Sequence, residues 1–498
     1  MKTKFNEFIN EHPYLFSALT LAILTLIVYG NVVFGPSNII ISHPGSDISL
    51  GFQNVSFSFS NLAHGQFPLW NPHMLSGYPW FASFQTLMLY PPAWIFLIFP
   101  TGTALNIFIA LHVFLIGFAA FCWLKQQNLH PLSCVLGGAL LMLCSQVTMQ
   151  IYAGEVTPIA AMPWMIFLLL TVDGCFDTKY RLRWVLAGTA SVALQIMAGF
   201  PQHVYYTGLV IGVYLVGKIL LASSVAWKER LKVLLSIAII YVWGVFLCSI
   251  QLLSTFAAAT ETARQGKLPF SFAGSYSFPP WNLVTLLTPR FFGDDNHLYY
   301  WGRSNVWEML FYIGVIGIFL AICGVLYGKQ KQRFLYLGII VLTALTAFGF
   351  YTPFYTFLYN YVPGFGSFRA NFRILFECSV FLAALAAMGF EALLTSSADD
   401  RVQAQSRIIS AVAAIIVIVA AVMTYLQSLP GHLSWFHSVM LATLHSKIQH
   451  MEPRFYKEIP NVLSVANYTS LQLILSAMTL IVMTLLFYLL KRNRRAVY

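Results

Sequence analysis

Long apolar runs separated by short polar stretches make up most of this chain. A helix needs about twenty residues to cross ~30 Å of hydrocarbon, and we find twelve runs near that length. They lie near residues 14–34, 104–124, 132–151, 157–172, 184–200, 204–221, 233–256, 306–327, 334–350, 374–394, 407–427 and 470–490. The pattern predicts an all-α polytopic membrane protein with about twelve transmembrane helices.

A different pattern occupies the long connection at residues 35–103. After Asp47, apolar residues recur at helical spacing, and uncharged polar residues take the other side. The apolar positions are Ile48, Phe52, Val55, Phe59 and Leu62. An uncharged amphipathic helix of this kind is expected to lie in the membrane interface. Aromatic residues and prolines follow, and they predict turns and a further interfacial segment around residues 82–98.

Composition agrees with a membrane protein. The 498 residues are 58% hydrophobic and only 9% charged, with a mean hydropathy of +0.71. The net charge is +11, but no basic segment interleaved with aromatic residues could follow a nucleic-acid backbone. No nucleic-acid partner is therefore expected. The seven cysteines lie in or beside apolar runs, so we predict no structural disulfide.

Lysine and arginine positions set the expected orientation. Most of them fall in the short connections, which the positive-inside rule places in the cytoplasm together with both termini. The N-terminal run is read as a retained first span because no cleavage site stands out. The long connections at residues 35–103, 257–305, 351–373 and 428–469 are then extracytoplasmic, so that face is the expected working surface.

Asp47 is the only Asp, Glu, Lys or Arg from His12 to Leu124. One interpretation is an N-cap, because Ser46 and Asp47 stand just before the predicted amphipathic helix. The other is a catalytic carboxylate at the membrane border.

Other isolated polar groups fall at predicted outer turns. Glu155 is the only formally charged residue between Gln126 and Val172, and Gln202 with His203 follows the helix-breaking Pro201. Glu155 can equally be a solvated turn residue, and His203 a structural one.

Two outer segments offer arginines. Arg290 lies in one of them, and Arg369 and Arg373 precede the tenth predicted span. Arginines at i and i+4 on one helical face suit an anionic head group, and interfacial snorkelling is the alternative.

The sequence gives little support for a metal site or a nucleotide-binding site. The histidines show no HxxxH or HxH spacing, so a dedicated zinc site is not expected, although Asp294 and Asp295 could add ligands for a divalent metal. Neither GxxxxGK[ST] nor GxGxxG occurs, so ATP use is not indicated. No cofactor is certain.

Several motifs in order resemble the YfhO family of bacterial membrane proteins. They are "GSD", "GQFPLWNPHMLSGYPWFASFQTLMLYPP", "GEVTPIAAMPW", "AGFPQHVYY", "QLLSTFAAATETARQG", "PPWNLVTLLTPRFFG" and "FRANFRILFECSVFLAALAAMGFEAL". The likeness spans about residues 40–394. That family is placed in the C-type glycosyltransferase (GT-C) superfamily, whose members use polyprenyl-phosphate sugars at the extracytoplasmic face and carry an acid in the first outer loop. Asp47 is the residue here that can match it.

The resemblance implies a glycosyltransferase of the bacterial cytoplasmic membrane. Asp47 would be the general base, and a polyprenyl-phosphate-linked sugar would be donor to an extracytoplasmic acceptor. The expected substrate-binding residues are Gln85, Glu155, Gln202, His203, Arg290, Arg369 and Arg373.

The chain departs from the family at its C-terminus, where only residues 428–469 stand in place of a larger outer domain. We therefore divide the chain into a GT-C-like module at residues 1–394 and C-terminal helices at 395–498. A non-catalytic transporter of lipid-linked glycans and a membrane scaffold remain alternatives. The oligomeric state is left open.

Overall fold

The computed structural model describes residues 2–36, 40–261, 266–295, 297–395, 400–429, 435–444 and 451–492. Its α-helices are α1 (Lys2–Glu11), α2 (Pro13–Val33), α3 (Ile48–Ala63), α4 (Thr101–Gln126), α5 (Pro131–Met142), α6 (Ser145–Tyr152), α7 (Val156–Gly174), α8 (Arg181–Met197), α9 (Pro201–Leu221), α10 (Trp227–Leu247), α11 (Ser249–Ala259), α12 (Phe270–Ala273), α13 (Val306–Met309), α14 (Val315–Tyr327), α15 (Gln332–Ala347), α16 (Pro353–Tyr361), α17 (Leu375–Thr395), α18 (Asp400–Leu426), α19 (Trp435–Leu444), α20 (Pro453–Lys457) and α21 (Ile459–Arg492). Short 3-10 helices are η1 (Phe84–Thr86), η2 (Pro91–Leu97), η3 (Pro280–Leu286), η4 (Gly349–Tyr351), η5 (Phe365–Ser367) and η6 (Asn371–Ile374). The strands β1 (Trp70–Asn71) and β2 (Tyr78–Pro79) pair antiparallel.

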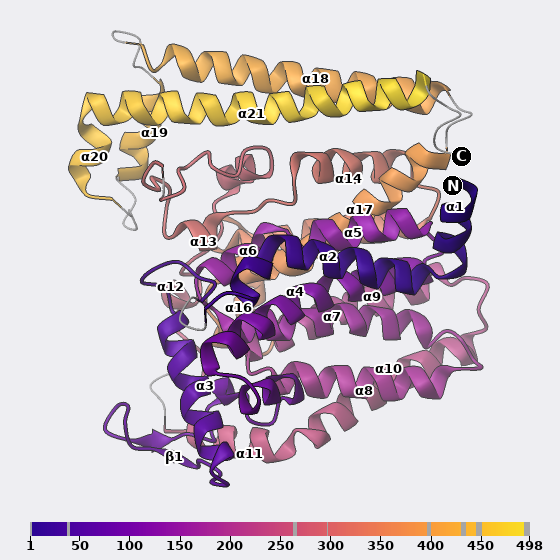
Figure 1. The fold of residues 1–498 in the computed structure, drawn as a ribbon, viewed down its shortest axis with the longest axis vertical. Coiled ribbons are helices and arrows are strands. Elements are labelled where there is room, and N and C mark those ends of the chain that lie inside the picture. Colours follow the sequence, from indigo (N-terminus) through magenta and orange to yellow (C-terminus); the bar gives the residue numbers. More distant parts are fainter. Residues whose placement is uncertain are drawn as a thin grey trace.

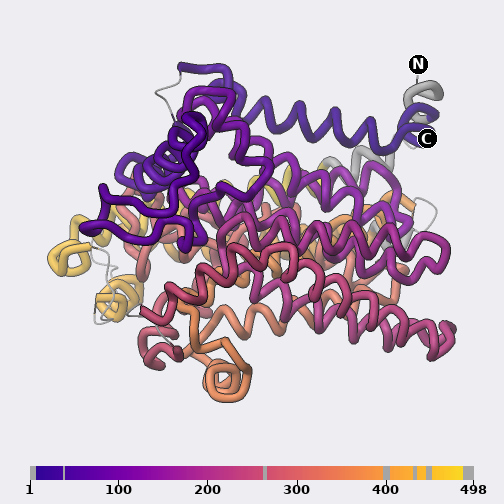
Figure 2. Tube along the Cα trace, turned by 90° about the horizontal axis from the view of Figure 1, so that it is seen from below, coloured from indigo at the N-terminus to yellow at the C-terminus, as the bar shows by residue number. Residues whose placement is uncertain are grey.

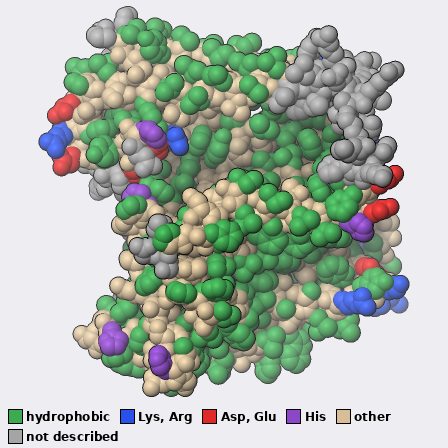
Figure 3. Space-filling view, in the orientation of Figure 1, with side chains coloured by type: hydrophobic (Ala, Val, Ile, Leu, Met, Phe, Trp, Pro, Cys, Tyr) green, Lys and Arg blue, Asp and Glu red, His purple; other side chains and the backbone are tan. Residues whose placement is uncertain are grey.

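Roughly parallel long helices form the body of the molecule (Figure 1). Among the described residues, nine helical segments are long and apolar enough to cross a membrane. The other three predicted spans are the shorter helices α8, α14 and α15, of 17, 13 and 16 residues. Each of the twelve predicted runs thus coincides with helix, and the chain is an all-α, multi-pass membrane protein. On the face in Figure 3, charged side chains gather at the two ends, and the band between them is hydrophobic or uncharged.

Three predicted spans are less continuous than their apolar runs suggested. The run at 233–256 is divided at Cys248 into α10 and α11. The run at 132–151 is divided into α5 and α6, because Leu143 and Cys144 interrupt the helix. The run at 306–327 contains the one-turn helix α13, then a non-helical stretch, and only then α14. Hydropathy alone cannot detect such breaks when the linking residues are themselves apolar.

The long connections gather at one end of the bundle, which we call the loop end. Helices α3, α12, α13, α19 and α20 lie there, at the left of Figure 1, whereas α1 lies at the opposite, terminal end. The amphipathic helix predicted after Asp47 is confirmed as α3, which buries Val55 and Phe59. The segment expected at 82–98 forms η1 and η2 rather than one helix. Parts of the predicted outer loops, residues 37–39, 262–265, 296, 430–434 and 445–450, lie outside the described residues.

Helices α18 and α21 form an antiparallel pair along one edge of the bundle (Figure 1). The pair meets the body mainly at α14, and Thr288 Oγ1 lies 3.0 Å from Ser476 Oγ. Figure 2 shows the whole bundle from below, with α2 along the upper edge of the view. The division of the chain at residue 395 remains a prediction.

A buried polar cluster ties four helices together at the terminal end. Asp173 of α7 lies 2.8 Å from Lys218 Nζ of α9 and accepts hydrogen bonds from Trp123, Gln127 and Tyr214. Lys218 also donates to Gln332 of α15 at 2.9 Å. We call these six residues the Asp173 cluster. Its charges are paired and hydrogen-bonded, as buried charges must be to persist in an apolar bundle.

Candidate functional site

A cavity of about 370 Å³ opens at the loop end, which we call the loop-end cavity. Segments far apart in the sequence form its wall: the start of α3, η1, the α6–α7 turn, the α8–α9 turn and the stretch before α17. Its lining includes Asp47, Asn54, Gln85, Glu155, Thr157, Phe200, Gln202, Arg369 and Arg373. Six of the eight residues that the sequence assigned to a site therefore line one cavity.

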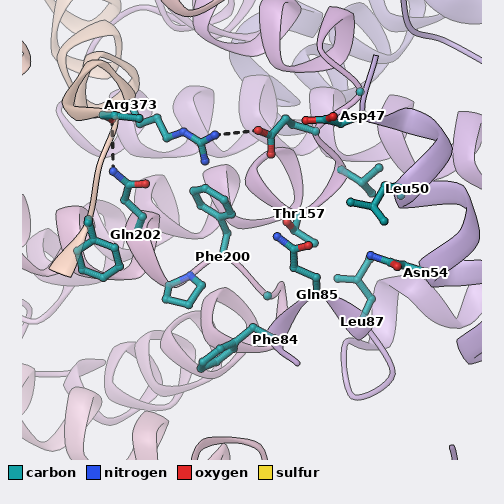
Figure 4. Close-up of a pocket in the computed structure, with 18 of the residues that line it drawn as sticks. Asp47, Leu50, Asn54, Phe84, Gln85, Leu87, Thr157, Phe200, Gln202 and Arg373 are labelled. Carbon is teal, nitrogen blue, oxygen red and sulfur yellow. Dashed lines mark hydrogen bonds and ion pairs between the residues drawn. The ribbon is translucent and has the colours of Figure 1, made fainter. Parts of the chain in front are cut away.

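Backbone contacts fix Asp47 at the cavity edge. Its amide donates to Ala153 O at 3.0 Å, just before Gly154, which has a φ of +77°. A Cβ on Gly154 would lie 2.3 Å from Ile48 N, so only glycine allows this close approach. Asp47 occupies the N-cap position of α3, as one interpretation expected, but its side chain makes no cap hydrogen bond to the helix. The carboxylate therefore remains available to the cavity (Figure 4).

Glu155 and Arg373 form an ion pair across the cavity. Arg373 Nη2 lies 2.7 Å from Glu155 Oε1, with the two side chains 15% and 22% exposed (Figure 4). The guanidinium also lies 4.7 Å from the centre of the Phe200 ring. Arg373 Nε is buried without a hydrogen-bond partner among the described residues. Glu155 is thus not an ordinary solvated turn residue, and Arg373 keeps an unused donor.

Gln202 holds the segment that carries both cavity arginines. Its side-chain nitrogen donates to Arg369 O at 2.6 Å and to Ala370 O at 3.3 Å. Ala370 has a φ of +63°, so the chain turns sharply there before η6 begins. Arg369 and Arg373 therefore do not share one helical face, contrary to expectation. They line the same cavity because of this turn, with the Arg369 guanidinium over the Phe272 and Tyr276 rings.

The position of Gln85 depends on a second close approach. Gly199 has a φ of +83°, and a Cβ there would lie 2.3 Å from Phe84 O. This glycine lets η1 sit directly against the α8–α9 turn. Gln85 consequently joins the lining beside Phe200 (Figure 4).

Two predicted site residues do not line the cavity. His203 is buried beneath it, with Nδ1 3.5 Å from Glu377 Oε1, and neither carboxylate oxygen of Glu377 has a hydrogen-bond partner among the described residues. Arg290 is 53% exposed and lies 3.4 Å from Asp294 in a separate loop. The sequence could not separate these cases, because a polar residue at a turn looks the same above or below a cavity floor.

The sequence missed one acid whose charge acts on this cluster, although it does not line the cavity. Glu308 of α13 interacts electrostatically with Arg373, Glu155, Arg369 and Asp47. Its burial raises the pKa of its carboxyl group to about 7. Glu308 is also the only formally charged residue between Arg303 and Lys329, the same signal that marked Asp47 and Glu155. It was overlooked because it begins a run predicted to be a membrane span.

In the described part of the chain, no group of three or more His, Cys, Asp or Glu residues could hold a metal ion. Asp294 and Asp295 lie outside the cavity lining. All seven cysteines are free thiols.

Comparisons with solved structures give a distant likeness. No protein-family model matches the chain, and no curated protein matches it. Among solved structures, ArnT from Cupriavidus metallidurans in the apo state aligns over 93% of this chain and 74% of its own, with 12% identity and a TM-score of 0.39. At that similarity nothing about function follows from the match.

Proposed function

We propose that this chain is a glycosyltransferase that moves a sugar from a polyprenyl-phosphate donor to an acceptor at the extracytoplasmic face of the bacterial cytoplasmic membrane. The observation that carries the proposal is the loop-end cavity, where Asp47 faces Glu155, Arg369 and Arg373. The YfhO-like motifs, which contribute all of these residues, agree with it.

The chemistry requires of the cavity a base and groups that stabilise the departing phosphate. A base must take the proton of the acceptor hydroxyl as its oxygen attacks the anomeric carbon, and Asp47 has an uncommitted carboxylate for this. The bond from the anomeric carbon to the phosphate oxygen then breaks, and its electron pair leaves with the phosphate. Arg369 and Arg373 stabilise that charge, Arg373 through the Nε that has no partner in the described structure.

The remaining lining residues have supporting roles. Gln85 and Glu155 bind sugar hydroxyls, because both present polar groups beside the aromatic ring of Phe200. Gln202 holds the arginine-bearing segment through its hydrogen bonds to the carbonyls of Arg369 and Ala370.

Packing favours an enzyme over a transporter of lipid-linked glycans. A transporter needs a route through the bundle, yet α4, α7 and α17 are largely buried between the two ends. A Cβ at Gly324 or Gly389 would lie 2.0 or 1.9 Å from the backbone of the facing helix, so α14 and α17 leave no space between them.

The test is transfer of a radiolabelled sugar from a synthetic polyprenyl-phosphate sugar by the purified protein in lipid nanodiscs. Release of free polyprenyl phosphate together with a labelled acceptor product is the expected result. Movement of intact donor across vesicles without bond cleavage would instead identify a transporter. Absence of both, with retained binding of an envelope protein, would identify a scaffold.

A further inference from the structure

Helix α3 lines the loop-end cavity beyond its first turn. Asp47, at its N-cap, and Asn54 both belong to the lining. They are seven residues apart, so they lie on one face of the helix with a rise of about 10 Å between them. Gly51, between them on this face, lets α3 pack closely against α7, because a Cβ there would lie 3.0 Å from Val156 Cγ2. The cavity therefore extends along α3 from Asp47 to Asn54.

Asn54 is a buried polar residue with an unpaired acceptor. It is 9% exposed, and its Oδ1 has no hydrogen-bond partner among the described residues. Ser58, the other polar residue that α3 buries, accepts a hydrogen bond from Trp80 Nε1 at 3.0 Å. Ser58 is not part of the cavity lining, whereas Asn54 is. Buried polar atoms are normally hydrogen-bonded, so the unpaired Oδ1 indicates an acceptor kept for a ligand.

The cavity wall around Asn54 is uncharged. Its neighbours in the lining are apolar or neutral side chains, drawn in Figure 4: Leu50, Gln85, Leu87 and Thr157. The ion pair of Arg373 with Glu155 lies on the other side of the cavity in that view. A charged group bound beside Asn54 would lack a counterion, and burial of an unpaired charge is costly. This part of the cavity therefore suits an uncharged group that donates a hydrogen bond.

We propose that Asn54 determines which donor sugar binds: its Oδ1 accepts a hydrogen bond from an uncharged O–H or amide N–H of the transferred sugar, and that sugar is neutral. This inference rests on the proposed function, because it assumes a polyprenyl-phosphate sugar as donor. The sugar is bonded to the phosphate, so with the phosphate at Arg369 and Arg373 it extends across the cavity toward Asn54. A uronic acid would bring a carboxylate to a wall that has no cation.

The experiment measures the Kd of the purified full-length protein for synthetic polyprenyl phosphodiesters that carry glucose, N-acetylglucosamine, glucuronic acid or only a methyl group. The methyl diester has the same phosphate charge and no sugar. The wild type should bind at least one neutral sugar more tightly than the methyl diester, and glucuronic acid more weakly than glucose. Asn54→Ala should lose about fivefold in affinity for the preferred neutral sugar, the effect of one hydrogen bond, and nothing for the methyl diester.

Asn61→Ala is the matched control. Asn61 lies seven residues further along α3, donates to Phe57 O at 2.7 Å and is outside the cavity lining, so its loss should change none of these affinities. If Asn54→Ala weakens the methyl diester as much as the sugars, or weakens nothing, the role of Asn54 is overturned and the proposed function stands.

The comparison of glucose with glucuronic acid needs no variant. Tighter binding of glucuronic acid by the wild type would overturn the neutral sugar even if Asn54→Ala does not fold. A wild type that binds the methyl diester as tightly as every sugar-bearing diester would overturn a sugar contact at Asn54. Binding of none of the diesters would overturn the proposed function itself, and this inference with it.

Discussion

The loop-end cavity and the Asp173 cluster both contain charged side chains in an otherwise apolar bundle. The two regions differ in how completely these side chains are paired and hydrogen-bonded. Asp173 has an ion-pair partner and hydrogen bonds from three side chains. Asp47 has no side-chain cap bond, and Arg373 keeps a buried Nε without a partner in the described structure. Buried polar groups are normally satisfied, so the saturated Asp173 cluster indicates stabilisation, and the buried, unpaired Nε of Arg373 indicates a group kept for a ligand. Asp47 is an exposed residue, so its carboxylate is open to solvent as well as to the cavity.

Replacement of Asp47 by Asn should have the largest effect on catalysis. Loss of a general base typically costs about 10² to 10⁴-fold in rate, so kcat should fall by that factor. The melting temperature should stay within a degree or two, because the side chain makes no bond to α3. Labelled-sugar transfer and thermal unfolding in detergent measure the two effects. Full activity in this variant would remove Asp47 from the mechanism.

Replacement of Asp173 by Ala should show the opposite behaviour. It leaves the partly exposed Lys218 without its carboxylate, and loss of such a charged hydrogen bond should cost about 2 kcal/mol in the free energy of unfolding. The kcat per folded molecule should not change. The double variant Asp173→Ala with Lys218→Met should recover part of the stability, because it leaves no unpaired charge. A loss of transfer without loss of stability would contradict a purely structural role for the cluster.

Arg373→Lys should have an intermediate effect on donor binding. Lysine keeps the charge but loses Nε and the planar contact with Phe200, so the KM for donor should rise about tenfold. The ion pair with Glu155 can persist, so the fold should not suffer. Steady-state kinetics at saturating acceptor gives the KM. An unchanged value would mean that the phosphate binds elsewhere.

The two regions were not equally visible in the sequence. Helical spacing of apolar residues predicted α3. The length of the apolar runs predicted the twelve spans, because burial in lipid demands long apolar runs. Lone acids identified Asp47 and Glu155, since an isolated charge in an apolar stretch requires a partner or a task. Glu308 carried the same signal but was assigned to a span, because a run of apolar residues does not reveal a break such as that between α13 and α14.

Pairing across distant segments was not predictable at all. The ion pair of Glu155 with Arg373 joins residues 218 positions apart, and the sharp turn at Ala370 decides which way both arginines point. Asp173 and Lys218 looked like ordinary residues at the ends of predicted spans, although they form an ion pair between α7 and α9. Such contacts depend on how helices pack, which the apolar pattern of a single chain does not specify.

Arg290→Ala should have the smallest effect, and it tests how far the cavity reaches. The sequence grouped Arg290 with the two cavity arginines, but the structure places it 53% exposed beside Asp294, outside the lining. Exposed pairs contribute little, so stability should change by less than about 1 kcal/mol and the KM for donor by less than about twofold. Steady-state kinetics run alongside Arg373→Lys gives a direct contrast. A rise in KM equal to that of Arg373→Lys would mean that the phosphate site extends into the loop of residues 287–295, and that incomplete pairing at Arg373 does not mark its centre.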